Sequence, residues 1–194
     1  MFRFGILCRR AVGLLKDEQG AALLEFAISL PLLMVFVVGI YDFSGAFNQK
    51  QKIEQAAQEA AIIAGAQPTS DLGSTDANPP SLQAVSTAVF NSLTASGVLA
   101  AGACTAPGTP GGPTGLVWTY TITGCDSAGD QLIITINRGL ASTVSTPAVV
   151  GTMVTVQYPY HWRFNSVIQL LFPGSTTYAA TTTVKESATV HNQM

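Results

Sequence analysis

Charged residues are scarce in this chain of 194 residues, and basic residues are scarcer than acidic ones. There are 9 Lys and Arg against 11 Asp and Glu, so only 10% of the residues are charged and the net charge is −2. An ordinary soluble domain has about a quarter of its residues charged. The low charge predicts that part of the chain lies in lipid or against partners. The lack of a basic excess leaves no electrostatic case for binding nucleic acid.

Residues that bind metals or act as nucleophiles are equally few. The two histidines, His161 and His191, have no ligand spacing to any of the 3 cysteines, so no metal site is expected. Neither histidine lies in a recognisable nucleophile motif, and the glycines form no phosphate-binding pattern. We therefore assign no catalytic residue, expect no cofactor, and do not expect an enzyme.

One long apolar run stands out against this background. Residues 21–41 contain a single charge, Glu25. As a helix this segment would be about 32 Å long, which is enough to cross the hydrocarbon core of a membrane, about 30 Å thick. No other segment is long and apolar enough to span. Residues 21–41 are therefore the expected transmembrane segment of a single-pass protein.

The flanks of this segment predict its orientation. Residues 1–20 carry Arg3, Arg9, Arg10 and Lys16, which are four of the nine Lys and Arg residues. An excess of positive charge marks the cytoplasmic side of a span. We therefore expect residues 1–20 to be a cytoplasmic leader and the larger C-terminal part to be exported.

Glu25 is the most informative residue of the span, because a carboxylate inside a membrane segment is costly and usually has a function. If a peptidase cuts between Gly20 and Ala21, Ala21 gains an ammonium group four residues from Glu25. Glu25 could then pair with that ammonium or with the ammonium of a neighbouring subunit. The alternative is a glutamate that only snorkels to the cytoplasmic interface.

Gly20 precedes the apolar run, Glu25 is the fifth residue after Gly20, and basic residues lie upstream of both. This arrangement resembles the class III signal of type IV prepilins. The wider segment, roughly residues 16–60, resembles the TadE-like family of pseudopilins from tight-adherence pilus systems. The matching residues are Gly20, Glu25, Phe26, Pro31, Leu32, Leu33, Gly39, Ile40, Phe43 and Phe47.

The resemblance implies a minor pilin or pseudopilin in the bacterial inner membrane, processed after Gly20 and taking part in pilus assembly. The surface pilus is the further location that it implies. Gly20 and Ala21 are the expected processing site, and Glu25 and Phe26 the expected assembly residues. The implied partners are a prepilin peptidase, the assembly platform, other pilins and membrane lipid. The alternative function is an uncleaved, single-pass binding module of the cell envelope.

The helical pattern continues beyond the membrane as an amphipathic segment over residues 42–66. Its apolar stripe is predicted to include Phe43, Phe47, Ile53, Ala57, Ala60 and Ala64. Gly65 and Pro68 are typical of a helix end. Pro31 removes one backbone hydrogen bond inside the helix and predicts a kink there.

The remainder predicts a turn-rich linker over residues 67–80 and a small exported α+β head over residues 81–194. A helix is expected over residues 81–96 and a loop over residues 97–115. Apolar residues then alternate over 116–122, 132–136 and 150–158, which predicts an antiparallel sheet with one buried face. A last polar strand is expected over 176–184, preceded by a short helix over 162–172.

Cys104 and Cys125 lie in the part expected outside the cytoplasm, whereas Cys8 lies in the leader. Exported cysteines meet an oxidising compartment, so a Cys104–Cys125 disulfide is favoured over two unpaired thiols. It would close a loop rich in glycine and proline and contribute about 3 kcal/mol in the chain-entropy model.

Overall fold

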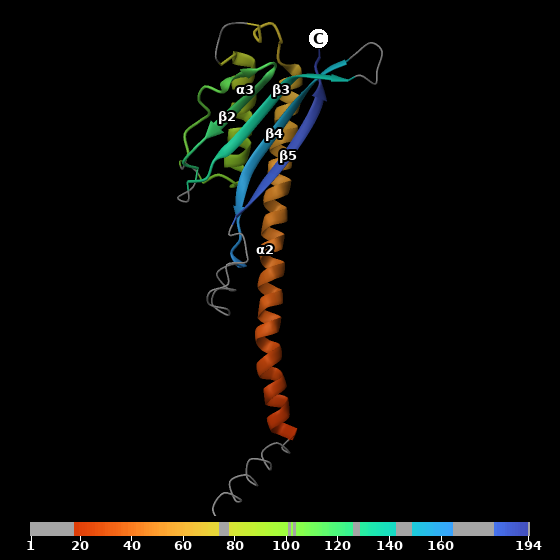
Figure 1. The fold of residues 1–194 in the computed structure, drawn as a ribbon, viewed down its shortest axis with the longest axis vertical. Helices are drawn as coiled ribbons and strands as arrows, with labels where there is room; N and C mark the ends of the chain where they lie inside the picture. Colours follow the sequence, from red (N-terminus) through yellow and green to blue (C-terminus); the bar gives the residue numbers. More distant parts are fainter. Residues whose placement is uncertain are drawn as a thin grey trace, which may run out of the picture.

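The computed structural model describes residues 18–73, 78–100, 102, 104–125, 129–142, 149–164 and 181–193. Over these residues the fold is α+β, as predicted, with a long N-terminal helix and a five-stranded antiparallel sheet. Figure 1 shows the helix as a stalk that extends well beyond the head. Of the expected leader, only residues 18–20 are described.

The stalk is a single helix, α2 (Glu18–Ala66), of 49 residues. At 1.5 Å per residue it is about 73 Å long, which confirms that the apolar run and the amphipathic segment form one helix. Pro31 lies inside the helix and does not end it. The most apolar window has a mean hydropathy of 2.4 and is not buried by the rest of the chain, so this helix is long and apolar enough to cross a membrane.

The sheet is a simple antiparallel meander with the strand order β1-β2-β3-β4-β5. Its strands are β1 (Gly111–Thr114), β2 (Val117–Ile122), β3 (Leu132–Ser142), β4 (Val149–His161) and β5 (Thr181–His191). The three strands predicted from apolar alternation are confirmed as β2, β3 and β4. The structure extends β3 and β4 beyond the predicted ends because the backbone pairing continues where the alternation has faded.

The two edge strands differ from the prediction. Strand β1 lies inside the segment predicted to be a loop, and all four of its residues are exposed. Strand β5 ends at His191 instead of residue 184, and no residue of it is fully buried. Both edges are polar, so backbone pairing rather than an apolar pattern defines them. Of the helix expected over 162–172, residues 165–172 lie outside the described residues.

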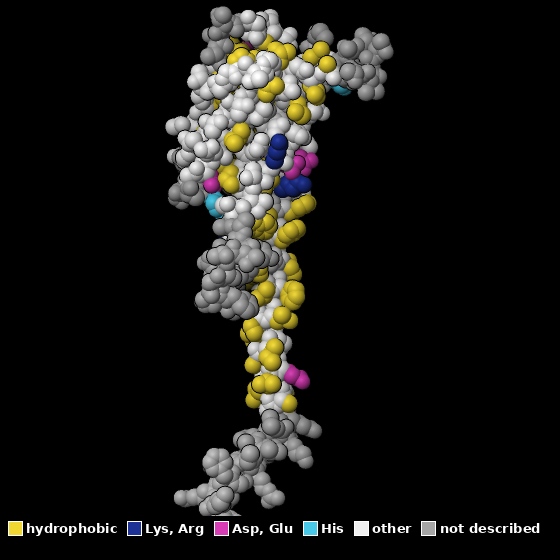
Figure 2. Space-filling view, in the orientation of Figure 1, with side chains coloured by type: hydrophobic (Ala, Val, Ile, Leu, Met, Phe, Trp, Pro, Cys, Tyr) yellow, Lys and Arg dark blue, Asp and Glu magenta, His cyan; other side chains and the backbone are white. Residues whose placement is uncertain are grey.

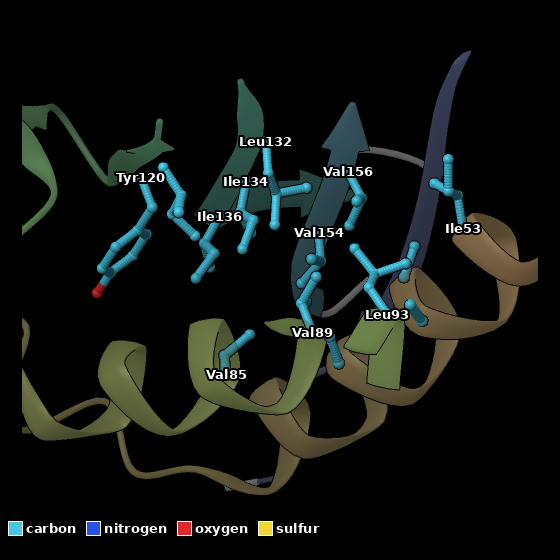
Figure 3. Packing of buried hydrophobic residues seen from close by; sticks show 14 of the residues in the cluster. Ile53, Val85, Val89, Leu93, Tyr120, Leu132, Ile134, Ile136, Val154 and Val156 are labelled. Carbon is cyan, nitrogen blue, oxygen red and sulfur yellow. The ribbon is translucent and has the colours of Figure 1, made fainter. Parts of the chain in front are cut away.

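The upper part of α2 and the helix α3 (Pro80–Ala95) cover one face of the sheet. Figure 3 shows side chains of α3 pointing toward those of β3 and β4, with Ile53 of α2 beside them. Full burial of each such aliphatic side chain stabilises the fold by about 1.5–3 kcal/mol. The largest fully buried apolar side chains are Trp118, Tyr120, Ile53, Leu82, Leu93, Leu99, Leu132, Ile134, Ile136, Val85 and Val89.

The head buries only the upper half of the predicted apolar stripe of the amphipathic segment. Ile53 is buried, and so are the alanines at 56, 57, 60, 61 and 64, whose small side chains let α2 lie close to the sheet and to α3. Phe43 and Phe47, by contrast, are 68% and 54% exposed. From Ile53 upward the apolar stripe of α2 is covered by the head, whereas these two rings stay on the surface.

A buried arginine closes the upper end of α2. Arg138 of β3 is 1% exposed, and its guanidinium donates to the backbone carbonyls of Ala64, Gln67 (2.9 Å) and Pro68 (3.2 Å). Carbonyls at the end of a helix lack partners further along the helix, and Arg138 supplies donors to one of them and to the two carbonyls just beyond the helix end. Burial lowers the pKa of Arg138, and the charge of Asp71 opposes that shift.

Asp71 also organises the segment expected to be a linker. Its carboxylate accepts hydrogen bonds from the backbone N–H of Ser81 at 2.9 Å and from the Ser81 hydroxyl at 3.0 Å. These contacts place a negative charge at the N-terminus of α3, where the helix dipole favours it. The described part of the linker is thus tied to both helices.

Candidate functional site

The expected processing and assembly residues lie together at the lower end of α2. Gly20, Ala21, Glu25, Phe26 and Pro31 are all exposed on the helix surface. The apolar helix window is 0% buried, so the described head does not cover this region. Large apolar side chains exposed on a helix of this kind are available for contact with lipid or with other membrane helices. The structure therefore leaves these five residues accessible without assigning them a partner.

The apolar surface of α2 extends further than the predicted span. Exposed large apolar side chains begin at Leu23 and continue to Phe47, a distance of about 36 Å along the helix axis. The only charged residue between Glu25 and Lys50 is Asp42. Asp42 is 2% exposed, so it does not interrupt the apolar surface. Figure 2 shows apolar side chains along the stalk up to the place where charged side chains gather at the base of the head.

Asp42 is buried because the head reaches down to it. The Tyr160 hydroxyl donates to Asp42 Oδ1 at 2.8 Å and also lies 3.0 Å from the Asp42 carbonyl oxygen. The backbone N–H of Phe164 donates to Asp42 Oδ2 at 2.7 Å. Both carboxylate oxygens thus accept a hydrogen bond, as a buried carboxylate requires.

Gly45 makes this contact possible. A Cβ atom at position 45 would lie 2.7 Å from Tyr160 Oη, closer than real side chains allow. Burial raises the pKa of Tyr160 to about 12, and the hydrogen bond to Asp42 and its charge act in the same direction. We call Asp42, Gly45, Tyr160 and Phe164 the Asp42 clasp. It fixes the lower end of β4 to the stalk.

Further contacts hold the lower end of the head in shape. The Trp162 indole N–H donates to Thr182 Oγ1 at 2.6 Å, and its ring packs edge-on against Tyr160 with centroids 5.1 Å apart. His161 Nε2 lies 2.5 Å from Asp130 Oδ2. These contacts join the end of β4 to β5 and to the segment before β3. The Asp42 clasp is therefore backed by side chains from three parts of the head.

Sequence reasoning did not find the clasp. No role was predicted from the sequence for Asp42, Tyr160 or Trp162. The one available signal is an acidic residue inside an otherwise apolar surface, three residues before a glycine. Such a carboxylate needs a partner, but the sequence does not show that the partner is 118 residues away.

The structure brings Cys104 and Cys125 together as neighbouring thiols that are not bonded to each other. Cys125 is buried and Cys104 is half-buried. Burial raises the pKa of Cys125 to about 12, and the adjacent Cys104 adds to the shift. The disulfide stays a prediction. Among the described residues, no group of three His, Cys, Asp or Glu side chains is arranged to hold a metal ion.

Residues 20–61 match the family model described as TadE-like protein, so the resemblance seen in the sequence is confirmed for this segment. The match begins at Gly20 and ends in the buried upper half of α2, and it covers 42 of the 194 residues (61 − 20 + 1). No curated protein and no solved structure matches the chain. The match shows that this part of α2 is similar to a structural, pilus-related family.

Proposed function

We propose that this TadE-like chain is a minor pilin or pseudopilin that takes part in assembling a tight-adherence pilus. The observation that carries the proposal is the match over residues 20–61, on a helix whose lower half is exposed, apolar and long enough to span a membrane. A chain with a long stalk helix and a compact head at one end has the form of a subunit that packs against other subunits through its stalk. The chain is not proposed to be an enzyme.

The proposed organisation has a leader over residues 1–20, a membrane anchor that starts at residue 21, and an exported head. The anchor lies in the bacterial inner membrane with its N-terminus in the cytoplasm, since four of the nine Lys and Arg residues precede it. A prepilin peptidase cuts between Gly20 and Ala21. The assembly platform and other pilins are the proposed partners.

Glu25 is the proposed assembly residue. It is exposed on a helix surface that is otherwise apolar from Leu23 to Phe47. After cleavage, the new ammonium of Ala21 lies four residues away, or one helical turn. We propose that Glu25 pairs with the ammonium of a neighbouring subunit. Breaking such a pair by removing the carboxylate costs about 3–5 kcal/mol when both groups are fully buried, and less near the interface.

The experiment is a Glu25→Gln variant in a strain that makes the pilus. The variant removes the charge and leaves the span more apolar, so insertion and cleavage should continue while pilus assembly fails. Glu59→Gln is the matched control, because Glu59 is exposed on the upper half of the same helix. Surface pili are counted and contacts to pilins are measured by cross-linking.

Normal pili from a cleaved Glu25→Gln protein would mean that the glutamate only snorkels to the interface. Two results together would favour the envelope-bound binding module instead. The protein would keep its leader in a strain with active peptidase, and a strain that lacks the protein would still make normal pili. Equal loss of pili in both variants would show a general effect of charge on the helix, not a specific role of Glu25.

A further inference from the structure

An apolar groove of about 660 Å³ runs along α2 where the stalk leaves the head. Four large side chains of the stalk line it at three- and four-residue steps, and all four are exposed on the described surface: Phe36, Ile40, Phe43 and Phe47. Among the described residues of the head, only Phe164 lines the groove. The groove is therefore an apolar face of the stalk that the described head reaches at a single point.

The chain leaves the described head at this groove and returns close to it. The backbone N–H of Phe164 donates to Asp42 Oδ2 at 2.7 Å, which fixes the start of the following segment against the stalk. Strand β5 begins at Thr181, which pairs with His161 at the end of β4. Figure 1 shows the lower ends of both strands beside α2. The 16 residues in between (180 − 165 + 1) therefore start and end at the level of the groove.

The sequence of this segment has an apolar face of its own. Phe164, Val167, Ile168 and Leu171 recur at three- and four-residue steps, which is typical of one face of a helix. The polar residues between them fall on the other side. Pro173 and the glycine after it are typical of a helix end. Residues 165–172 thus continue the helix expected over residues 162–172, with an apolar face that starts at Phe164.

The length and charge of the segment also suit the groove. As a helix, residues 165–172 would be about 12 Å long, which equals the length of α2 between Val35 and Phe43. Such a helix is far too short to span a membrane. No charged residue occurs between Arg163 and Lys185, so nothing opposes contact with the apolar stalk. Residues 173–180 could extend by about 26 Å, enough to return to β5.

We propose that residues 165–172 of this chain pack in the apolar groove of α2 as a short helix antiparallel to the stalk. Ile168 and Leu171 then lie against Ile40 and Phe36. Asp42 directly follows the predicted span, so this helix lies beside the outer part of the span and brings the head down to the membrane surface. Lipid and partner helices are left with the opposite face of α2. The inference depends neither on cleavage after Gly20 nor on a role in pilus assembly.

Photo-cross-linking of the full-length protein in vesicles of dioleoyl-phosphatidylglycerol and dioleoyl-phosphatidylethanolamine tests the proposal. The photoreactive residue p-benzoylphenylalanine replaces Phe36 or Ile40, which are 63% and 71% exposed and so tolerate substitution. An equal mixture of ¹⁵N-labelled and unlabelled chains separates links within a chain from links between copies. Both positions should give a link within the chain to residues 165–172.

The sequence provides a simple readout and a matched control. Trypsin cuts after Arg163 and Lys185, so one peptide, 164–185, carries the whole segment. Met34 is 58% exposed and lies two residues before Phe36, about 200° around the helix. The photoreactive residue at position 34 should therefore give no link to this peptide.

Two charge variants test the apolar face of the segment. Leu171→Asp places a carboxylate against the groove, where its desolvation is unfavourable, so the link from position 36 should fall to the level seen from position 34. Gln169→Asp adds the same charge on the polar side of the segment and should leave the link unchanged.

Links between labelled and unlabelled chains from positions 36 and 40 would overturn the proposal, because the groove would then bind a second copy. Adducts with lipid alone, equal links from position 34, or an undiminished link in Leu171→Asp would overturn it as well. A protein that gives the expected link within the chain but is never cleaved after Gly20 would keep this inference and remove the pilus proposal.

Discussion

Alanine usually stabilises a helix relative to glycine, but at position 45 it should destabilise this protein. The gain in helix propensity is about 1 kcal/mol. The new Cβ would lie 2.7 Å from Tyr160 Oη, so the tyrosine must move and its hydrogen bond to Asp42 is lost. A hydrogen bond to a charged group contributes about 1.5–3 kcal/mol. The Gly45→Ala variant should therefore be less stable by about 0.5–2 kcal/mol.

The effect of Gly45→Ala on stability should change sign when the tyrosine hydroxyl is absent. In a Tyr160→Phe background the nearest remaining ring atom would be Cζ, at 3.7 Å from the new Cβ, which is an ordinary contact. Alanine at position 45 should then stabilise the protein by about 1 kcal/mol. The double-mutant cycle should accordingly show a coupling of about 1.5–3 kcal/mol between the two positions.

Urea unfolding of the full chain in a non-ionic detergent measures all four corners of this cycle. Tryptophan fluorescence reports on the head, because Trp118 is buried in its core and Trp162 lies against Tyr160. If Gly45→Ala stabilises the protein equally in both backgrounds, the clasp does not contribute to stability as the structure indicates. If neither Gly45→Ala nor Tyr160→Phe changes the free energy of unfolding, the head is not held to the stalk at this point.

Three further predictions concern the head. Tyr160 keeps its proton in the folded state up to a pKa of about 12, against an ordinary value of 10.0, so its contribution is complete below pH 10 and is lost as the pH rises to about 12. Tyr160→Phe should lack this alkaline loss in unfolding curves, and identical pH profiles would contradict the assignment. Cys104 and Cys125 should be bonded in protein recovered from the envelope, as peptide mapping without reductant would detect, and free thiols at both positions would refute it. Arg138→Met should lower stability by about 3 kcal/mol in thermal unfolding, since it removes the donors to the part-buried carbonyls of Gln67 and Pro68, just beyond the end of α2.

Much of the fold could be predicted because it depends on local patterns. The long apolar run predicted the stalk, and alternation of large apolar residues predicted the three central strands. Trp118, Tyr120 and Ile122 are buried on one face of β2 as that alternation requires, whereas Leu116, predicted to share the face, precedes the strand and is exposed. Alternation marks a strand only where one of its faces is buried, so the polar edges β1 and β5 gave little signal.

The clasp could not be predicted, because it depends on how distant elements meet. Phe43 and Phe47 fit an apolar stripe with Ile53, and only the position of the head shows that the two phenylalanines stay exposed. Asp42 directly follows the predicted span, and the sequence shows no partner for it. Its burial depends on Tyr160, which lies at the far end of β4.

The N-terminus of the protein recovered from the membrane tests the central claim most directly. Intact-mass measurement together with N-terminal sequencing should find a chain that begins at Ala21 and has 174 residues (194 − 20). The same protein from a strain without the prepilin peptidase should retain Met1 or another leader residue. Recovery of the uncleaved chain from a strain with active peptidase would contradict the account.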